Sequence, residues 1–271
     1  MIEGRLDSAQ VAIDQLRRMG ATPTWQDARM VQLVGTGRYG EAVRLYRSIP
    51  PEDLSSPARR RAPVRQYYFS ALLERGQVEE VTTAIRAFHR NTRAARALGR
   101  GVQMDELAEI MIHQGRLAEA EKLLPELDRL LADTPDYREL ENRRYIEGIL
   151  ALARGRPREA IPLLERNKPM SSPGRFQAQR ADALSRAYMA VGDTARAISE
   201  LEWIQATATM TLDVHSLFQT MANLASLYER TGRREEALGI YRRLEAQYRG
   251  AEPGCRLREI AVEGIRRLSR A

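Results

Sequence analysis

Apolar residues recur along most of the chain at three- and four-residue spacing, in blocks that are interrupted by single glycines. In one such block, Leu224 and Tyr228 precede Gly232, and Ala237 and Tyr241 follow it. Each half has the period of an amphipathic helix. The glycine stands where the first helix must end and the chain reverse, a position that suits a residue able to adopt φ > 0. Because the connection is short, the pattern predicts two antiparallel helices.

This arrangement recurs at a nearly fixed period. Each turn glycine is followed five residues later by a small apolar residue and four residues after that by a larger one. Successive glycines are 39, 39, 40, 37 and 40 residues apart, and they are Gly37, Gly76, Gly115, Gly155, Gly192 and Gly232. A period in this range is the signature of a repeat array. One hairpin cannot bury its own apolar stripe, so the pattern predicts an all-α solenoid of stacked hairpins.

The repeat resembles that of the tetratricopeptide repeat (TPR) superfamily. The matching features are the turn glycine, the small residue five positions later and the aromatic residue or leucine after it. Tyr188 and Tyr228, each four residues before a turn glycine, and Gly148, seven residues before Gly155, also match. The repeats are longer than the usual 34 residues, and the tryptophan common near the start of the motif is absent. The resemblance implies a long-repeat bacterial type with a right-handed superhelix of antiparallel helix pairs.

Three regions are expected along the chain. Residues 1–20 form a partial repeat or an N-terminal capping helix, residues 21–254 form six hairpins, and residues 255–271 form a C-terminal capping helix. The run Ile-Glu-Gly-Arg at positions 2–5 also matches a protease sequence used to remove tags. We favour the turn of an incomplete repeat, because Ala9 and Ile13 follow Gly4 at the repeat spacing. On this interpretation the chain is part of a longer protein.

Positive charge is concentrated in one stretch. The formal net charge is +7, and residues 58–100, with ten arginines and three glutamates, carry all of that excess. Five arginines there share one face of a predicted helix, namely Arg86, Arg90, Arg93, Arg96 and Arg100. The stripe could bind nucleic acid or an acidic partner, or it could be a solvated outer face. We favour the solvated face, because no aromatic residues interleave to stack on bases.

Motifs for catalysis are missing from the sequence. The three histidines are far apart and match no metal-binding spacing, and Cys255 has no histidine near it in sequence. The Gly-Thr-Gly-Arg-Tyr-Gly run at 35–40 matches a dinucleotide-binding pattern, but no strand precedes it. We therefore expect no enzymatic activity, no cofactor and no metal. The single cysteine and the lack of an 18-residue apolar run favour a cytoplasmic protein.

The TPR resemblance implies that the first helix of each hairpin lines a concave groove. Transferring the groove positions gives the candidate partner-binding residues Asp27, Asp105, Glu109, Asn142, Tyr145, Asp182 and Arg186. The middle of this set is mildly acidic and predicts a basic or polar helix or extended peptide as ligand. The Lys/Asn/Arg set with which chaperone-binding relatives hold a C-terminal carboxylate is absent. The groove could also be filled by a neighbouring segment of the parent protein.

These features together predict a protein-interaction scaffold, the TPR module of a larger bacterial signalling or regulatory protein. Two alternatives remain open at this stage. One is a nucleic-acid or acidic-partner binder that uses the Arg86–Arg100 stripe. The other is a structural scaffold that self-associates through an exposed apolar end.

Overall fold

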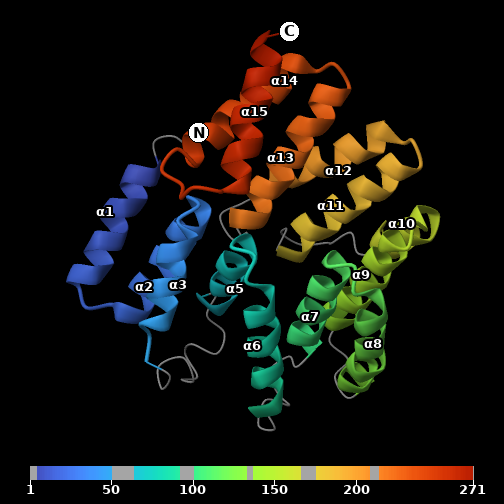
Figure 1. Ribbon diagram of the computed structural model, residues 1–271, viewed down its shortest axis with the longest axis horizontal. Coiled ribbons are helices and arrows are strands. Elements are labelled where there is room, and N and C mark those ends of the chain that lie inside the picture. Colours follow the sequence, from blue (N-terminus) through green and yellow to red (C-terminus); the bar gives the residue numbers. More distant parts are fainter. Residues whose placement is uncertain are drawn as a thin grey trace. The chain divides into compact units, whose positions relative to one another are not determined.

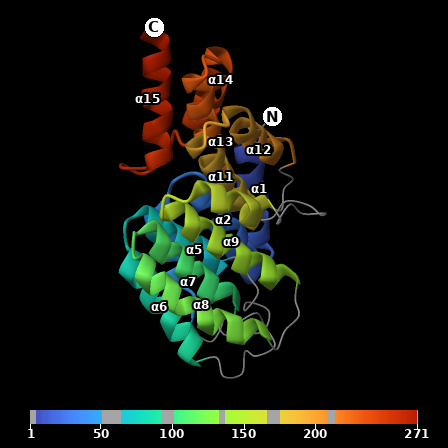
Figure 2. The same ribbon diagram turned by 90° about the vertical axis from the view of Figure 1, so that its right-hand side faces the viewer.

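Figures 1 and 2 show the computed structural model of the chain in two views. It describes residues 5–50, 64–91, 101–132, 137–165, 175–207 and 214–270. Within these ranges every regular element is an α-helix. The predicted all-α class is confirmed.

The helices follow one another in pairs, and the two members of each pair are connected by a turn at a predicted glycine. The first helices are α2 (Thr22–Gly35), α5 (Val64–Glu74), α7 (Gly101–His113), α9 (Tyr137–Ala153), α11 (Arg175–Ala190) and α13 (Val214–Arg230). The second helices are α3 (Tyr39–Arg47), α6 (Val78–Asn91), α8 (Leu117–Ala132), α10 (Pro157–Glu165), α12 (Thr194–Thr207) and α14 (Arg234–Gln247). Helix α1 (Arg5–Arg18) precedes this series and α15 (Arg256–Arg270) follows it.

The turn glycines adopt the left-handed conformation that the pattern predicts. At Gly232, φ is +77°, and the values at the other five turns lie between +71° and +85°. The Gly232 amide donates to the Glu229 carbonyl, and the Arg233 amide donates to the Tyr228 carbonyl at 2.8 Å. This pair of bonds satisfies carbonyls that the helix end leaves free. A side chain with a Cβ would be strained at such a φ, which explains why glycine recurs here.

An arginine and a glutamate also clamp the start of several second helices. Arg38 donates to Glu41 through two bonds of 2.6 Å, and Arg116 donates to Glu119 through two bonds of 2.7 Å. The same pairing recurs three residues apart at Arg156–Glu159 and Arg233–Glu236. The glutamate lies in the first helical turn, where the helix dipole favours a negative charge.

Packing divides the chain into two compact units, residues 1–77 together with 228–271, and residues 78–227. In the first unit, α1 packs on α2, the helices α2, α3 and α5 pack together, and α15 packs on α14. The core of this unit includes Met30, Tyr39, Leu72, Tyr241 and Leu257. The three regions expected from the sequence stay a prediction, because this division follows contacts rather than repeat boundaries.

The first unit brings together residues from both ends of the repeat series. The Gln247 side-chain amide donates to the Gly35 carbonyl at 2.7 Å, and the Glu252 amide donates to the Gly37 carbonyl at 3.1 Å. The connection between α14 and α15 therefore packs on the turn between α2 and α3.

The second unit contains the helices α6 to α12 and most of α13. From α6 to α12 successive helices pack as neighbours, and α9 is in contact with α7, α8, α10 and α11. Leu107, Met111, Ile146, Leu164 and Leu184 lie in its core and are almost completely buried. Stacked first helices are the arrangement that the groove prediction requires.

Candidate functional site

In the second unit, predicted groove residues on neighbouring first helices contact one another. The Tyr145 hydroxyl on α9 donates to Glu109 Oε1 on α7 at 2.8 Å. His113, one turn after Glu109, places its Nε2 3.6 Å from the same carboxylate oxygen. A tyrosine and a histidine from two helices therefore converge on one carboxylate.

A second polar group lies on α11 and α13. Arg186 Nε donates to Asp182 Oδ2 at 3.0 Å along α11. The Asn223 side-chain amide on α13 donates to the other oxygen of Asp182, and Gln219 donates to Asn223 Oδ1 at 3.3 Å. We call these side chains the polar row, and its members are Glu109, His113, Tyr145, Asp182, Arg186, Gln219 and Asn223.

The polar row has a buried part and an open part. Glu109 and Tyr145 are 7% and 3% exposed, so they are covered although they occupy groove positions. The side chains of His113 and Arg186 are about half exposed, at 51% and 48%, and Asp182 is 23% exposed. A ligand approaching this face would therefore meet Asp182, Arg186 and His113 first.

The Tyr145 side chain, in the buried part of the polar row, is held in its neutral form. Burial, followed by the neighbouring Glu109 carboxylate, raises the pKa of Tyr145 well above its usual range. The phenol therefore stays protonated at neutral pH and serves as the donor to Glu109. Since it keeps its proton, the hydrogen bond is a fixed feature of this face.

The remaining predicted groove residues are placed differently. Asp27 lies on α2 in the first unit and is partly exposed. Asp105 and Asn142 lie on α7 and α9, respectively, but their side chains are outside the described residues. The structure thus brings together Glu109 with Tyr145, and Asp182 with Arg186. Asn223 was not selected from the sequence, because it does not fall at one of the transferred groove offsets.

The basic stripe is only partly described. Arg86 is exposed on α6, and the backbone of Arg90 belongs to the same helix. Arg93, Arg96 and Arg100 lie outside the described residues. The stripe therefore stays a prediction.

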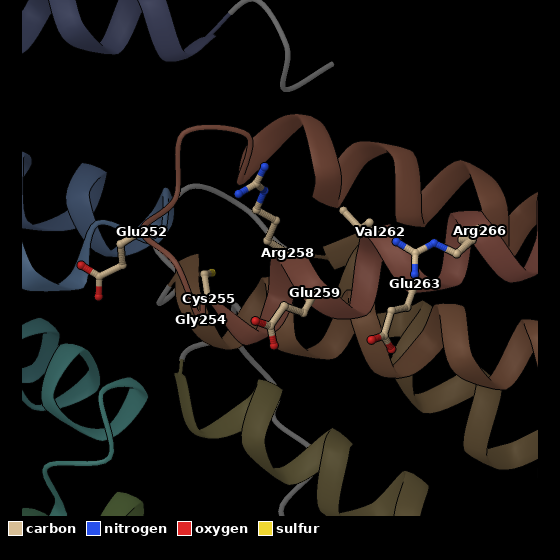
Figure 3. Close-up of a pocket in the computed structure, with 8 residues that line it drawn as sticks. All are labelled: Glu252, Gly254, Cys255, Arg258, Glu259, Val262, Glu263 and Arg266. Atoms are coloured by element: carbon tan, nitrogen blue, oxygen red, sulfur yellow. The ribbon is translucent and has the colours of Figure 1, made fainter.

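A shallow pocket lies along the solvent side of α15 (Figure 3). Its volume is about 280 Å³, and its lining residues are Glu252, Gly254, Cys255, Arg258, Glu259, Val262, Glu263 and Arg266. Cys255 is buried, and this burial raises the pKa of its thiol. A protonated, covered thiol is a poor nucleophile.

In the ranges that the structure describes, no group of three or more His, Cys, Asp and Glu side chains is arranged to hold a metal ion. None of the helices in that part of the chain has the length and apolarity needed to cross a membrane.

Comparison with known proteins supports the fold. The tetratricopeptide repeat family matches residues 220–252, which surround Gly232. No curated protein matches the chain. A crystal structure of a tetratricopeptide repeat protein from Parabacteroides merdae ATCC 43184 is similar over 98% of this chain and 93% of that chain. Its TM-score is 0.52 and the sequence identity is 17%.

Two further solved structures contain nearly identical TPR-like repeats of a putative kinesin light chain from Podosopora anserina. One of them is 24% identical, with 72% of this chain and 92% of that chain covered and a TM-score of 0.42. The other is 25% identical, with 66% and 89% covered and a TM-score of 0.40.

Proposed function

We propose that this chain, a protein of the tetratricopeptide repeat superfamily, is a protein-interaction scaffold that binds a partner helix or extended peptide on the polar row. The observation that carries this proposal is that predicted groove side chains bond across neighbouring helices, Tyr145 of α9 with Glu109 of α7 and Asp182 of α11 with Asn223 of α13. We further propose that it is non-catalytic and cytoplasmic, and acts as the interaction module of a larger bacterial signalling or regulatory protein.

The open part of the polar row, Asp182 and Arg186, can give up its ion pair and bind a partner's charged groups instead. The Arg186–Asp182 pair is partly exposed, and such pairs contribute only about 0–1 kcal/mol to stability. A partner carrying a basic and an acidic group can replace this pair at little cost. The buried Tyr145–Glu109 bond connects α7 to α9 and so limits their movement, which lowers the conformational cost of binding.

The test compares two double variants of equal charge. Asp182→Ala/Arg186→Ala removes the open pair of the row. Arg156→Ala/Glu159→Ala removes an exposed pair with the same charges at the start of α10. Both variants leave the net charge unchanged. Each is used to select from a displayed library of helical and extended peptides and to capture proteins from a lysate of the source organism.

We expect wild type and the α10 variant to retain the same peptides and one shared protein, and the row variant to lose both. Binding at the row should persist when salt is raised from about 50 to about 300 mM, because short-range contacts are screened less than distant charges. Binding that survives in the row variant, disappears in Arg86→Ala/Arg90→Ala/Arg93→Ala and falls steeply with salt would show that the basic stripe is the working surface.

A further inference from the structure

The connection between the last two helices of the chain is fixed on the first hairpin. We call residues Gln247–Cys255 the clasp segment. Its backbone and side-chain amides donate to the carbonyls of Gly35 and Gly37 at the end of α2. A helix end leaves such carbonyls without partners. The clasp segment therefore completes the hydrogen bonding of the turn between α2 and α3.

The Glu252 carboxylate joins the clasp segment to two further elements. One oxygen accepts from the backbone amide of Gly40 at 2.8 Å, and the other accepts from Arg75 at 3.0 Å. Gly40 lies in the first turn of α3, whose preceding residue, Arg38, makes no side-chain capping bond. Glu252 therefore supplies the negative charge and acceptor that a helix N-terminus favours. Figure 3 shows Glu252 on the side that faces the blue ribbon of the first hairpin.

Packing around Gly37 is closer than around the other turn glycines. A Cβ at Gly37 would lie 2.7 Å from Ala251 Cβ, 2.9 Å from Cys255 Sγ and 3.0 Å from a ring carbon of Tyr248. Such a Cβ at Gly115, where φ is also +73°, would have no heavy atom within 4 Å. Gly37 is therefore required by the clasp segment as well as by the turn.

We propose that the clasp segment is a conformational lock that makes the first hairpin and the last pair of helices, α14 and α15, open and close together. In a repeat array without such contacts, each repeat touches only its neighbours and can unfold locally. Here residues 212 positions apart are joined by hydrogen bonds and a close-packed turn. A molecule that binds or loosens one of these elements must then change the stability of the other.

The first experiment uses the two glycines as a matched pair. Gly37→Ala and Gly115→Ala impose the same left-handed strain on their own turns, but only the first meets the clasp segment. Amide hydrogen exchange of the full chain is measured by mass spectrometry for both variants. Glu252→Ala, which removes a partly exposed carboxylate without overpacking, serves as the milder third variant.

We expect Gly37→Ala to speed exchange by about tenfold or more in α2 and α3 and also in α14 and α15. Gly115→Ala should speed exchange only in α7 and α8. Glu252→Ala should show the two-ended pattern of Gly37→Ala at smaller amplitude. If Gly37→Ala and Glu252→Ala each alter only the hairpin or segment that carries the substitution, the lock does not exist.

A second measurement uses a probe that the chain already contains. Cys255 is its only cysteine, and this thiol, 2% exposed, lies 3.9 Å from the Tyr39 hydroxyl. Its rate of reaction with a soluble thiol reagent reports opening of the clasp segment. Met30→Ala, at a fully buried position of α2, should speed this reaction about tenfold or more, since it destabilises the element to which the clasp is bound. Leu184→Ala, equally buried in the second unit, should leave the rate unchanged. Equal rates for Met30→Ala and wild type would overturn the proposal, as would an equal increase in both variants.

Discussion

Glycine has two separate uses in this chain, and the difference is decided by what lies next to each residue. At the turns it provides a positive φ. Within helices it provides room, as at Gly264 on α15, where the Tyr241 ring lies directly against the Cα. Gly239 on α14 is also inside a helix, but a Cβ there would meet nothing within 4 Å.

The same substitution should therefore have opposite effects at these two helical glycines. Gly264→Ala should destabilise the protein by about 1–3 kcal/mol, because its methyl group would overlap the Tyr241 ring. Gly239→Ala should stabilise it by up to about 1 kcal/mol, because alanine favours the helix. Denaturant unfolding followed by circular dichroism measures both changes. A stabilising Gly264→Ala would mean that Tyr241 moves aside at little cost.

A buried arginine should be the most sensitive residue of the second unit. Arg180 is 2% exposed. It donates to the Leu164 carbonyl at 3.3 Å and to Glu200 at 3.5 Å, so it joins α10, α11 and α12. Arg180→Ala should cost about 3–5 kcal/mol, because it removes the bonds to Leu164 and Glu200 and takes away one charge of a buried pair. Unfolding curves in urea test this expectation.

Replacing both charged partners is the control for that experiment. Arg180→Met/Glu200→Met removes the cation and the carboxylate together and fills their space with apolar side chains. This double variant should lie within about 1–2 kcal/mol of wild type or above it. An Arg180→Ala variant as stable as the double one would show that the ion pair contributes little.

Individual residues differ in how far the sequence could predict their roles. The turn glycines were predictable because their requirement is local and recurs with the period. Gly148, selected as a match to the repeat, does lie against Leu164. The burial of Glu109 and Tyr145 was not predictable, since it depends on how neighbouring hairpins stack. Arg180 gave no signal, because a single arginine in a helix is usually exposed.

Between elements, side-chain bonds hold the last helices together. Glu229 near the end of α13 accepts two bonds from Arg267 on α15, at 2.8 and 3.0 Å. The Tyr241 hydroxyl on α14 donates to Glu229 Oε2 at 2.9 Å. One carboxylate therefore joins the end of α13 to α14 and α15. Burial and this bond to Glu229 raise the pKa of Tyr241 to about 12.

This carboxylate should make the stability of these helices sensitive to acid. The bonds from Arg267 lower the pKa of Glu229 below its ordinary value of 4.5. A folded-state pKa below the unfolded one gives stability that is fully present above pH 4.5 and lost as the pH falls through the lowered value. At pH 7, Glu229→Gln should cost about 0.5–1 kcal/mol, a modest figure because Arg267 is half exposed.

The difference between wild type and Glu229→Gln should shrink when unfolding is measured at pH 3 instead of pH 7. Glu235→Gln, which changes an exposed glutamate on α14, is the matched control for the loss of one negative charge. A gap that stays constant between pH 3 and pH 7 would mean that the Glu229 carboxylate does not favour the folded state.

At the scale of the whole molecule, the sequence predicted the helical class and the order of the hairpins. The period identified which residues form turns and which helices come first in each pair. It could not predict the clasp segment, because contacts between residues 212 positions apart leave no periodic trace. In the sequence Glu252 is an ordinary loop glutamate, and its role is seen only from its contacts with Gly37 and Gly40 in the structure.

That long separation also has a consequence for how the protein is made. When Gly40 leaves the ribosome, its partner Glu252 is still 212 residues away. At about 5–20 residues per second, translation of that stretch takes roughly 10–40 s. During this interval the nascent first hairpin has an uncapped α3 and an uncovered turn. The hairpin of α2 and α3 therefore stays incomplete long after it is synthesised, and the nascent chain must keep it from other partners until the clasp segment arrives.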